Sequence, residues 1–402
     1  MICRSARSNS RSEQRSRGEE HTLSRTVFLH VGVAKTGTTY LQRTMALNRS
    51  LLREHDVLYP GRKNSAHFMA SLDLRNATFH SHSYAKSAGA WAKLVSETNA
   101  WHGSTVISHE TFARTPHKRI REAVASFDTD DVRVVVTARD LGRQLPAVWQ
   151  EGAKNRNTQS YDDFLGEALG AANGIDSAAS TSGSDVTARI NSFWNVHDIA
   201  AVAERWAQAV DSSSVIIVTV PPTGSDRHEL WRRFAQAVEL PAAAYDFDDS
   251  KPNTSLGAAE SELLRILNER LPAEVDWRTY ERRIKRGFVQ QTLARQRSHG
   301  TLGLPTRWQS LVEELAEDTV QALGSGGYSV VGNLADLRPR WQRDEGMLPQ
   351  QLTDRQLLEV AVSLLGSLVT EDSQETTGKE PGLRNSGNQV VGRLRNKVRG
   401  NR

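Results

Sequence analysis

The chain has 402 residues, of which 38% are hydrophobic, and it carries a formal net charge of +4. This length suffices for one large domain. The single cysteine, Cys3, excludes an internal disulfide, a CxxC redox pair and a cysteine-based zinc cluster. No apolar run is long enough to cross a bilayer, and the Arg- and Ser-rich start lacks the apolar core of a secretory signal. These features predict a soluble, cytoplasmic protein.

Positive charge is concentrated at the two ends of the chain. Residues 1–25 contain six Arg and three Glu, and residues 379–402 contain seven Lys or Arg and one Glu. The residues between these ends therefore carry negative charge overall, so we expect no specific nucleic-acid binding by the folded part. Three parts are predicted: a disordered basic tail over 1–24, one domain over 25–339, and an extension over 340–402 with one helix and a disordered basic tail.

Short apolar runs alternate with helical patterns along the chain. Strands are predicted at residues 26–31, 56–61, 104–110, 131–140 and 214–222. Helices are predicted after Thr36, over 111–127, from Pro146, and over 198–211, 226–240 and 354–368. This alternation predicts an α/β fold, a three-layer P-loop-type domain with a central parallel sheet and helices on both faces. The Gly-, Ala- and Ser-rich segment 168–184 is predicted to be a surface loop.

The sequence FLHVGVAKTGTTYLQ, residues 28–42, places a glycine-rich turn between the first strand and the first helix. Gly32 and Gly37 match the glycines of the nucleotide-binding pattern GxxxxGK[ST], but Thr38 stands where that pattern has its lysine. Backbone N–H groups and threonine hydroxyls can still bind an anion at the start of the helix, with Lys35 beside it as a point charge. The residues predicted to hold the anion are Lys35, Thr36, Gly37, Thr38 and Thr39.

The run Lys35-Thr36-Gly37-Thr38-Thr39 resembles the 5′-phosphosulfate loop of the sulfotransferases that use PAPS (3′-phosphoadenylyl sulfate), whose pattern is K-[ST]-G-T-[ST]. Further segments resemble an actinobacterial sulfotransferase-like family, and they occur in the expected order over most of the predicted domain. These segments are 108–110, 139–150, 193–194 with Asp198, 253–257 and 327–334. The resemblance implies that PAPS is the sulfuryl donor and that no metal is required.

The resemblance also implies a binding site for the 3′-phosphate of PAPS. Arg139 stands just past a predicted strand, where sulfotransferases place an arginine for this phosphate. Arginine suits the role because its guanidinium binds phosphate in a bidentate manner. The serine that usually shares this phosphate is replaced by Ala147, so Arg143 or Gln144 is expected to help. The alternative for Arg139 is a local ion pair with Asp140.

The predicted strand 104–110 ends in His109 and Glu110, either of which could take the proton of an acceptor hydroxyl. Adjacent residues of an extended chain point to opposite sides, so one of the two can face the cleft. Many carbohydrate-modifying sulfotransferases use a glutamate and the cytosolic small-molecule enzymes use a histidine; we favour Glu110, followed by His109. Alternatively, Glu110 complements the dipole of the helix that follows. By the resemblance, Asn253 and Ser255 lie near the nucleotide, in a segment that also suits a capped helix start.

Together these residues predict an enzyme, a PAPS-dependent sulfotransferase acting on a hydroxyl or amine of a small-molecule or glycan acceptor, such as a carbohydrate, a lipid or a secondary metabolite. Lys35 would stabilise charge on the departing phosphate oxygen, and residues 156–191 would help to choose the acceptor. One alternative is a P-loop kinase or NTPase, which would need a lysine at Thr38 and an acid for Mg²⁺. The other is a nucleotide-binding protein that has lost catalysis, an idea that Ala147 supports.

Overall fold

The structure is a computed structural model, and it describes residues 25–79, 84–172, 193–241, 243–248, 256–293, 300–341 and 346–377. The predicted disordered N-terminal tail and the C-terminal tail beyond residue 377 therefore lie outside the described residues, as do Asn253 and Ser255. The chain divides into two compact units. Unit 1 comprises Met1–Ala138, Asp198–Asp248 and Leu323–Asn333, and unit 2 comprises Arg139–His197, Asp249–Ala322 and Leu334–Arg402. The domain boundaries at residues 25 and 339 stay predictions.

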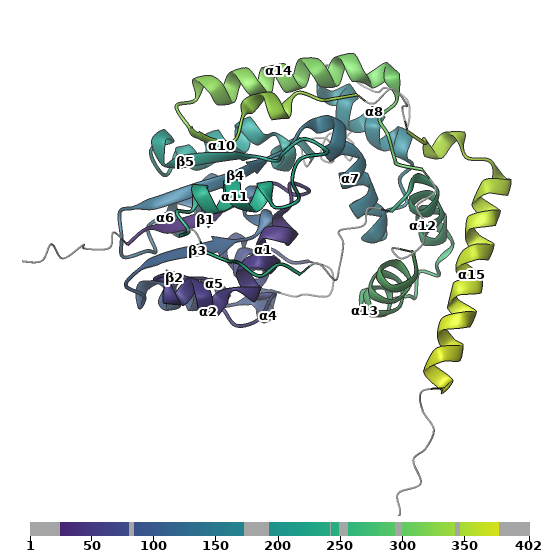
Figure 1. The fold of residues 1–402 in the computed structure, drawn as a ribbon, viewed down its shortest axis with the longest axis horizontal. Coiled ribbons are helices and arrows are strands. Elements are labelled where there is room, and N and C mark those ends of the chain that lie inside the picture. The colour runs from purple at the N-terminus through teal and green to yellow at the C-terminus, as the bar shows by residue number, and fades with distance from the viewer. Residues whose placement is uncertain are drawn as a thin grey trace, which may run out of the picture. The chain divides into compact units, whose positions relative to one another are not determined.

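A parallel sheet of six strands forms the centre of unit 1 (Figure 1), in the order β2-β3-β1-β4-β5-β6. The strands are β1 (Val27–His30), β2 (Val57–Leu58), β3 (Ser104–Ser108), β4 (Val132–Ala138), β5 (Val215–Thr219) and β6 (Ser329–Val331). The central parallel sheet of the predicted α/β fold is thus confirmed. The edge strand β6 was not predicted from the sequence.

The helices of unit 1 connect these strands. They are α1 (Thr38–Leu47), α2 (Arg49–Glu54), α3 (Ala66–Arg75), α4 (Tyr84–Ser87), α5 (Ala90–Asn99), the 3₁₀ helix η1 (Glu110–Arg114), α6 (His117–Val124), α10 (Ile199–Ala207), the 3₁₀ helix η2 (Ser212–Ser214) and α11 (Glu229–Ala237). Side chains of a strand alternate between the two faces of a sheet. Phe28 pairs with Val106 on one face and Leu29 with Ile107 on the other, and all four are buried. Both faces are therefore covered.

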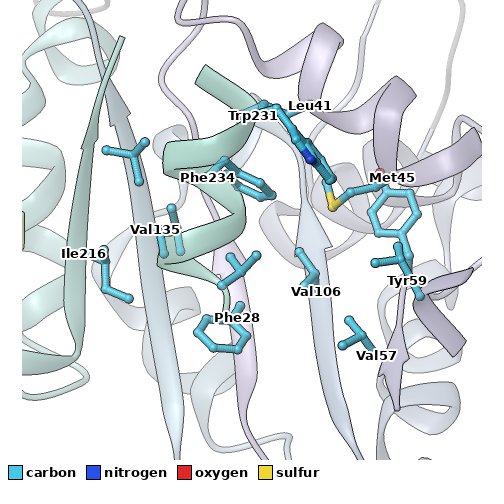
Figure 2. Packing of buried hydrophobic residues seen from close by; sticks show 14 residues of the cluster. Phe28, Leu41, Met45, Val57, Tyr59, Val106, Val135, Ile216, Trp231 and Phe234 are labelled. Carbon is cyan, nitrogen blue, oxygen red and sulfur yellow. The ribbon is translucent and has the colours of Figure 1, made fainter. Parts of the chain in front are cut away.

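Helices α1 and α11 cover the face of the sheet that carries Phe28. Figure 2 shows Leu41 and Met45 of α1, and Trp231 and Phe234 of α11, in one apolar cluster with Phe28. Burying a large apolar side chain stabilises a fold by about 1.5–3 kcal/mol. The cluster thus fixes α1, and with it the loop at its start, against the sheet.

Unit 2 is helical and has its own apolar clusters. Its elements are α7 (Leu141–Lys154), α8 (Tyr161–Ala172), α12 (Ala258–Arg270), α13 (Trp277–Tyr280), the π-helix η3 (Glu281–Thr292), the 3₁₀ helices η5 (Thr306–Trp308), η6 (Leu334–Leu337) and η7 (Pro349–Gln351), α14 (Gln309–Ser325) and α15 (Asp354–Thr377). The prediction of a surface loop at 168–184 is wrong at its start, because α8 continues to Ala172. The buried side chains of Leu165 and Leu169 pack one face of this helix. Helix α15 likewise continues past the predicted end at residue 368.

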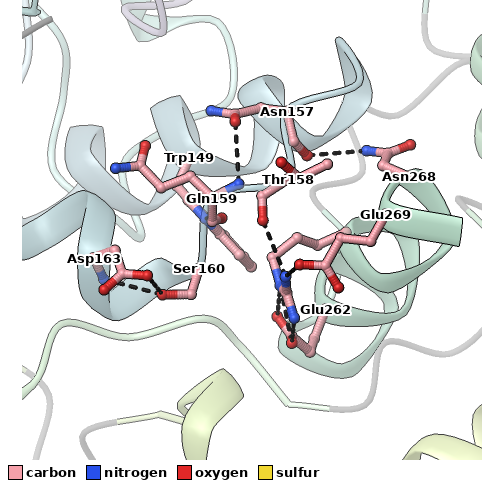
Figure 3. Close-up of polar contacts among 10 residues, drawn as sticks. Trp149, Asn157, Thr158, Gln159, Ser160, Asp163, Glu262, Asn268 and Glu269 are labelled. Carbon is pink, nitrogen blue, oxygen red and sulfur yellow. Dashed lines mark hydrogen bonds and ion pairs between the residues drawn. The ribbon is translucent and has the colours of Figure 1, made fainter. Parts of the chain in front are cut away.

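Polar contacts with α12 hold the connection between α7 and α8 (Figure 3). Asn268 Nδ2 donates to the carbonyl oxygen of Asn157 at 3.1 Å, and Arg265 donates to that of Thr158 at 3.0 Å. Arg265 also pairs with Glu262 at 2.6 Å. The beginning of the segment that is predicted to choose the acceptor is therefore anchored. Among the described helices, none has both the length and the apolar character needed to cross a bilayer.

Candidate functional site

The carboxyl ends of β3, β1 and β4 lie next to one another in unit 1. From β1 the chain continues to β2 on one side of the sheet, whereas β4 is followed by β5 on the other side. Such a reversal between neighbouring strands opens the crevice in which open α/β sheets bind their ligands. The predicted anion loop follows β1, and His109 and Glu110 follow β3. The topology therefore brings the loop and the two predicted bases to the same edge.

The loop between β1 and α1 adopts the left-handed backbone conformation at Gly32 (φ 77°), Lys35 (φ 68°) and Gly37 (φ 86°). The surroundings also crowd both glycines, with backbone at Gly32 and the end of a leucine side chain at Gly37. A Cβ atom on Gly37 would lie 2.3 Å from Leu230 Cδ2, and one on Gly32 would lie 2.7 Å from Glu110 Cα. A lysine held in this conformation is the kind of local strain that concentrates at functional sites. Left-handed turns of this type form concavities of backbone N–H groups that bind anions.

Helix α1 begins at Thr38, and no described side chain caps its first turn at Gly37. The first turn contains no acidic residue. The N–H groups at the start of a helix need acceptors, and the helix dipole adds partial positive charge there. Together with the concave loop, this helix start fits a phosphate or sulfate group.

The hydroxyl of Thr36 is turned into the protein. It donates to the carbonyl oxygen of Val33 at 2.6 Å and lies 2.5 Å from Thr137 Oγ1. Thr137 therefore donates to Thr36 and accepts from His30 Nε2 at 3.2 Å, while His30 Nδ1 accepts from Ser108 Oγ at 2.7 Å. This chain of hydrogen bonds ties the loop to β1, β3 and β4. Any contact between Thr36 and an anion would therefore come from its backbone N–H.

A second buried histidine, His67 of α3, lies beneath the end of β3. Its Nε2 donates to the carbonyl oxygen of Pro60 at 2.8 Å, and its Nδ1 accepts from the N–H of Ser108 at 2.9 Å. Burial lowers the pKa of His67 to about 4 and that of His30 to about 3. Both rings are therefore neutral structural elements of the fold at neutral pH.

We expect the free energy of unfolding to fall as the pH is lowered below about 6.5. The unfolded chain protonates both histidines near this pH, whereas in the fold the pKa of His67 is about 4 and that of His30 about 3. The unfolded state therefore binds more protons in this window, and a tenfold difference in proton affinity between the two states is worth about 1.4 kcal/mol. The stabilisation is complete above the unfolded pKa and is lost as the pH approaches the folded values.

Urea titrations at about pH 7 and about pH 5 measure this dependence. The variant His67→Gln should be less stable than the wild type at the higher pH and should show a shallower loss of stability toward the lower one. The exposed His102 provides the control His102→Gln, which should keep the wild-type dependence. The same pH dependence in all three proteins would contradict the interpretation.

Glu110 is placed against the anion loop. Gln42 Nε2 donates to its Oε2 at 3.2 Å, and the hydroxyl of Thr38 also donates to its carboxylate. Burial raises the pKa of Glu110, but the nearby His109 and these donors more than offset this effect, and the pKa lies below its ordinary value. The side chain is 27% exposed. An ionised, partly accessible carboxylate therefore stands beside the start of α1.

His109 caps η1. Its Nδ1 accepts the backbone N–H of Thr111 at 3.2 Å and lies 2.7 Å from the Thr111 hydroxyl. Burial lowers the pKa of His109, although the neighbouring Glu110 acts in the opposite direction. The neutral ring thus carries its proton on Nε2, and this nitrogen cannot accept another. Of the two predicted bases, Glu110 is the one whose carboxylate acts as an acceptor next to the loop.

Arg139 and Arg143 stand at the start of α7, in unit 2. Asp140 accepts the backbone N–H of Arg143 at 3.0 Å, and its carboxylate also pairs with Arg143 Nε. Burial and the charge of Arg143 lower the pKa of Arg139 to about 10, although Asp140 opposes them. The guanidinium groups of Arg139 and Arg143 therefore lie near each other at the start of α7. Neighbouring guanidinium groups are suited to binding a phosphate group.

Other residues of α7 contribute packing. Gln144 is fully buried and lies 3.4 Å from His197 Nδ1. Trp149 is buried in an apolar cluster and donates from Nε1 to the carbonyl oxygen of Gln159 at 3.0 Å. Ala147 is half-buried and offers no polar group that could replace a serine. The predicted roles of Asn253 and Ser255 concern positions outside the described residues.

Sequence reasoning missed two polar residues of this site. Gln42 lies four residues after Thr38, which is one helical turn, so both face the same side of α1 and both reach Glu110. That spacing could have identified Gln42. His30 interrupts the apolar run of β1, and a buried polar residue at that position could have indicated a hydrogen-bond network.

The chain is an α/β protein, and the predicted anion loop lies at the carboxyl edge of its parallel sheet. No protein-family model matches the chain, and no curated protein matches it. Among solved structures, it is similar to a sulfotransferase from Alicyclobacillus acidocaldarius, with a TM-score of 0.36 and 16% sequence identity over 62% of this chain and 98% of that one. In the described ranges, no group of three or more His, Cys, Asp or Glu residues could hold a metal ion. The function is therefore argued from the site.

Proposed function

We propose that this protein is a PAPS-dependent sulfotransferase. The observation that carries the proposal is the Glu110 carboxylate, which accepts hydrogen bonds from Thr38 and Gln42 beside the anion loop. Transfer of a sulfuryl group to a hydroxyl needs a base within hydrogen-bond reach of that hydroxyl, next to the group being transferred. Here one helix start supplies donors for an anion and also holds a carboxylate.

The loop residues fit the phosphosulfate end of PAPS. The left-handed conformation at Lys35 and Gly37, and the uncapped first turn of α1, present backbone donors to an anion. Lys35 lies within the loop, so we propose that its charge acts on the oxygen between phosphate and sulfate. PAPS, when bound, supplies the sulfuryl group. Glu110 then receives the proton of the acceptor hydroxyl or amine.

For the 3′-phosphate we propose Arg139 with help from Arg143. Arg139 follows Ala138, the last residue of β4, directly in the chain. Arg143 belongs to the first turn of α7, where a phosphate would also meet the positive end of the helix dipole. The acceptor is proposed to be a carbohydrate, a lipid or a secondary metabolite.

A P-loop kinase or NTPase is the second candidate, and Glu110 is also the observation that favours it. An acid after β3, the strand next to β1, could hold Mg²⁺ near the hydroxyls at the start of α1. Such enzymes use a lysine to reach the terminal phosphates. Here Thr38 occupies that position, and its hydroxyl donates to Glu110. A threonine bound to Glu110 in place of that lysine supports the sulfotransferase over the kinase.

Calorimetric titration with PAP, the desulfated donor, and with ATP separates these candidates. We expect tight PAP binding that does not depend on Mg²⁺ and that weakens in Lys35→Ala and Arg139→Ala. The exposed Lys93 of α5 provides the control Lys93→Ala, which should bind PAP like the wild type. Tighter binding of ATP with Mg²⁺ than of PAP would reject the proposal in favour of the kinase. PAP binding without turnover on a broad acceptor panel would indicate a binding protein that has lost catalysis.

A further inference from the structure

Helix η1 carries opposite charges at its two ends. Its first residue is Glu110 and its last is Arg114. A 3₁₀ helix rises about 2 Å per residue, so roughly 8 Å of helix axis separates the two residues. This distance is comparable to the size of a single sugar ring with its substituents. An acceptor of this length that presents a hydroxyl to Glu110 would extend as far as the end of η1 at which Arg114 stands.

Arg75, the last residue of α3, is fixed beside the same helix. Its Nε donates to the carbonyl oxygen of Ser71 at 3.1 Å, and the hydroxyl of Ser71 is hydrogen-bonded to that of Thr111 in η1. One turn earlier on α3, the ring of Phe68 lies 5.2 Å from the ring of His109. These contacts tie α3 to the segment that contains Glu110. Among the described residues, Arg75 donates through Nε, and its terminal nitrogens remain for another acceptor.

The two arginines lie close enough to repel each other. Burial and the charge of Arg114 lower the pKa of Arg75 to about 10, and burial also lowers the pKa of Arg114. Neither forms an ion pair with an acidic residue, within the part of the chain that the structure describes. Arg205 of α10 adds a third guanidinium, which donates to the carbonyl oxygen of Ala113 at 3.3 Å. The guanidinium groups of Arg75, Arg114 and Arg205 thus gather at the end of η1, and Asp198 lies near that of Arg205.

We propose that Arg75 and Arg114 bind an anionic group of the acceptor, so that the acceptor is a molecule that already carries a phosphate, sulfate or carboxylate. This inference rests on the proposed function, because it assigns the acceptor that Glu110 would deprotonate. An oxyanion held by two guanidinium groups forms charge-assisted, bidentate hydrogen bonds. It would also relieve the repulsion between the arginines. The two arginines would hold the acceptor by its anionic group. The distance along the acceptor from that group would then decide which of its hydroxyls reaches Glu110.

Inorganic phosphate and acetate are the probes for this site. They are titrated into the full chain, labelled with ¹⁵N-arginine and saturated with PAP so that the donor site is filled. The Nε–Hε signals of Arg75 and Arg114 are assigned from Arg75→Lys and Arg114→Lys. Both signals should shift saturably, and Arg75→Ala and Arg114→Ala should each weaken anion binding by about 10-fold or more. Preference for phosphate would indicate a phosphate or sulfate ester on the acceptor, and preference for acetate a carboxylate.

Arg121 of α6, an exposed arginine, provides the control Arg121→Ala, which should bind both anions like the wild type. PAP affinity is measured for every variant. Unchanged PAP affinity shows that the variant is folded and that the donor site is intact. Two results would contradict this inference while the proposed function stands, provided that PAP binds. Either the two arginine signals do not shift in the wild type, or the remaining arginine of each alanine variant shifts as it does in the wild type. If PAP does not bind the wild type, the proposed function itself fails.

Discussion

Replacing Lys35 with alanine should lower the turnover of sulfuryl transfer by about 10²-fold or more, judging from the loss of comparable electrostatic donors. The backbone of Lys35 is held in the left-handed conformation, with φ at 68°, so its side chain leaves the loop from a defined position. In the proposed reaction its charge acts mainly where negative charge builds as the sulfuryl group leaves. Turnover should therefore fall more than PAP affinity, because the interaction strengthens in the transition state.

Steady-state rates at saturating PAPS, together with PAP calorimetry, measure both effects. Lys35→Arg keeps the charge and should recover part of the lost turnover. Lys93→Ala removes an exposed lysine of α5 and should leave turnover unchanged. If the loss of PAP affinity accounted for the whole loss of rate in Lys35→Ala, the lysine would serve binding alone.

Replacing Glu110 with glutamine should lower turnover by about 10²–10⁴-fold, the range expected for the loss of a general base. Glutamine has the same shape, and its carbonyl oxygen can still accept the hydrogen bonds of Thr38 and Gln42. PAP affinity and stability should therefore stay close to those of the wild type. Rates and PAP binding are compared with those of Glu122→Gln, an exposed glutamate of α6 that pairs with Arg119.

His109→Asn separates the two predicted bases. Asparagine is a strong N-cap residue and can still accept the N–H of Thr111, which His109 Nδ1 accepts in the structure. Turnover should then stay within about 10-fold of the wild type, because His109 caps η1 and its other nitrogen carries a proton. A larger loss in His109→Asn than in Glu110→Gln would assign the base to the histidine.

The buried strands were predictable because burial leaves a direct mark on the sequence. Strands β1, β3, β4 and β5 are short runs of mostly apolar, β-branched residues, as expected for strands covered on both faces. The edge strand β6 was missed because Ser329 and Val330 are exposed and its partner β5 is distant in sequence. The glycine that follows β6, Gly332, is required for steric reasons, because a Cβ atom there would lie 2.2 Å from Thr219 Oγ1.

Helix ends were less predictable. The small residues at the end of α8 suggested a loop, yet Ala168 and Leu169 are buried and belong to the helix. Packing against other segments, which no local pattern reports, decides such cases. The division into two compact units was also hidden, because each unit is assembled from three separate stretches of the chain.

The sequence by itself predicted the elements of the proposed site: a glycine-rich loop with Lys35 after the first strand, and an acid, Glu110, after the third. Both positions follow from apolar runs and turn residues that are local in the chain. Only the tertiary structure decided which side chains face the loop. Glu110 is held by Gln42, which is 68 positions away, and the hydroxyl of Thr36 is bound to Thr137, which is 101 positions away. The direction of a polar side chain depends on its hydrogen-bond partner, and here folding alone brings the partners together.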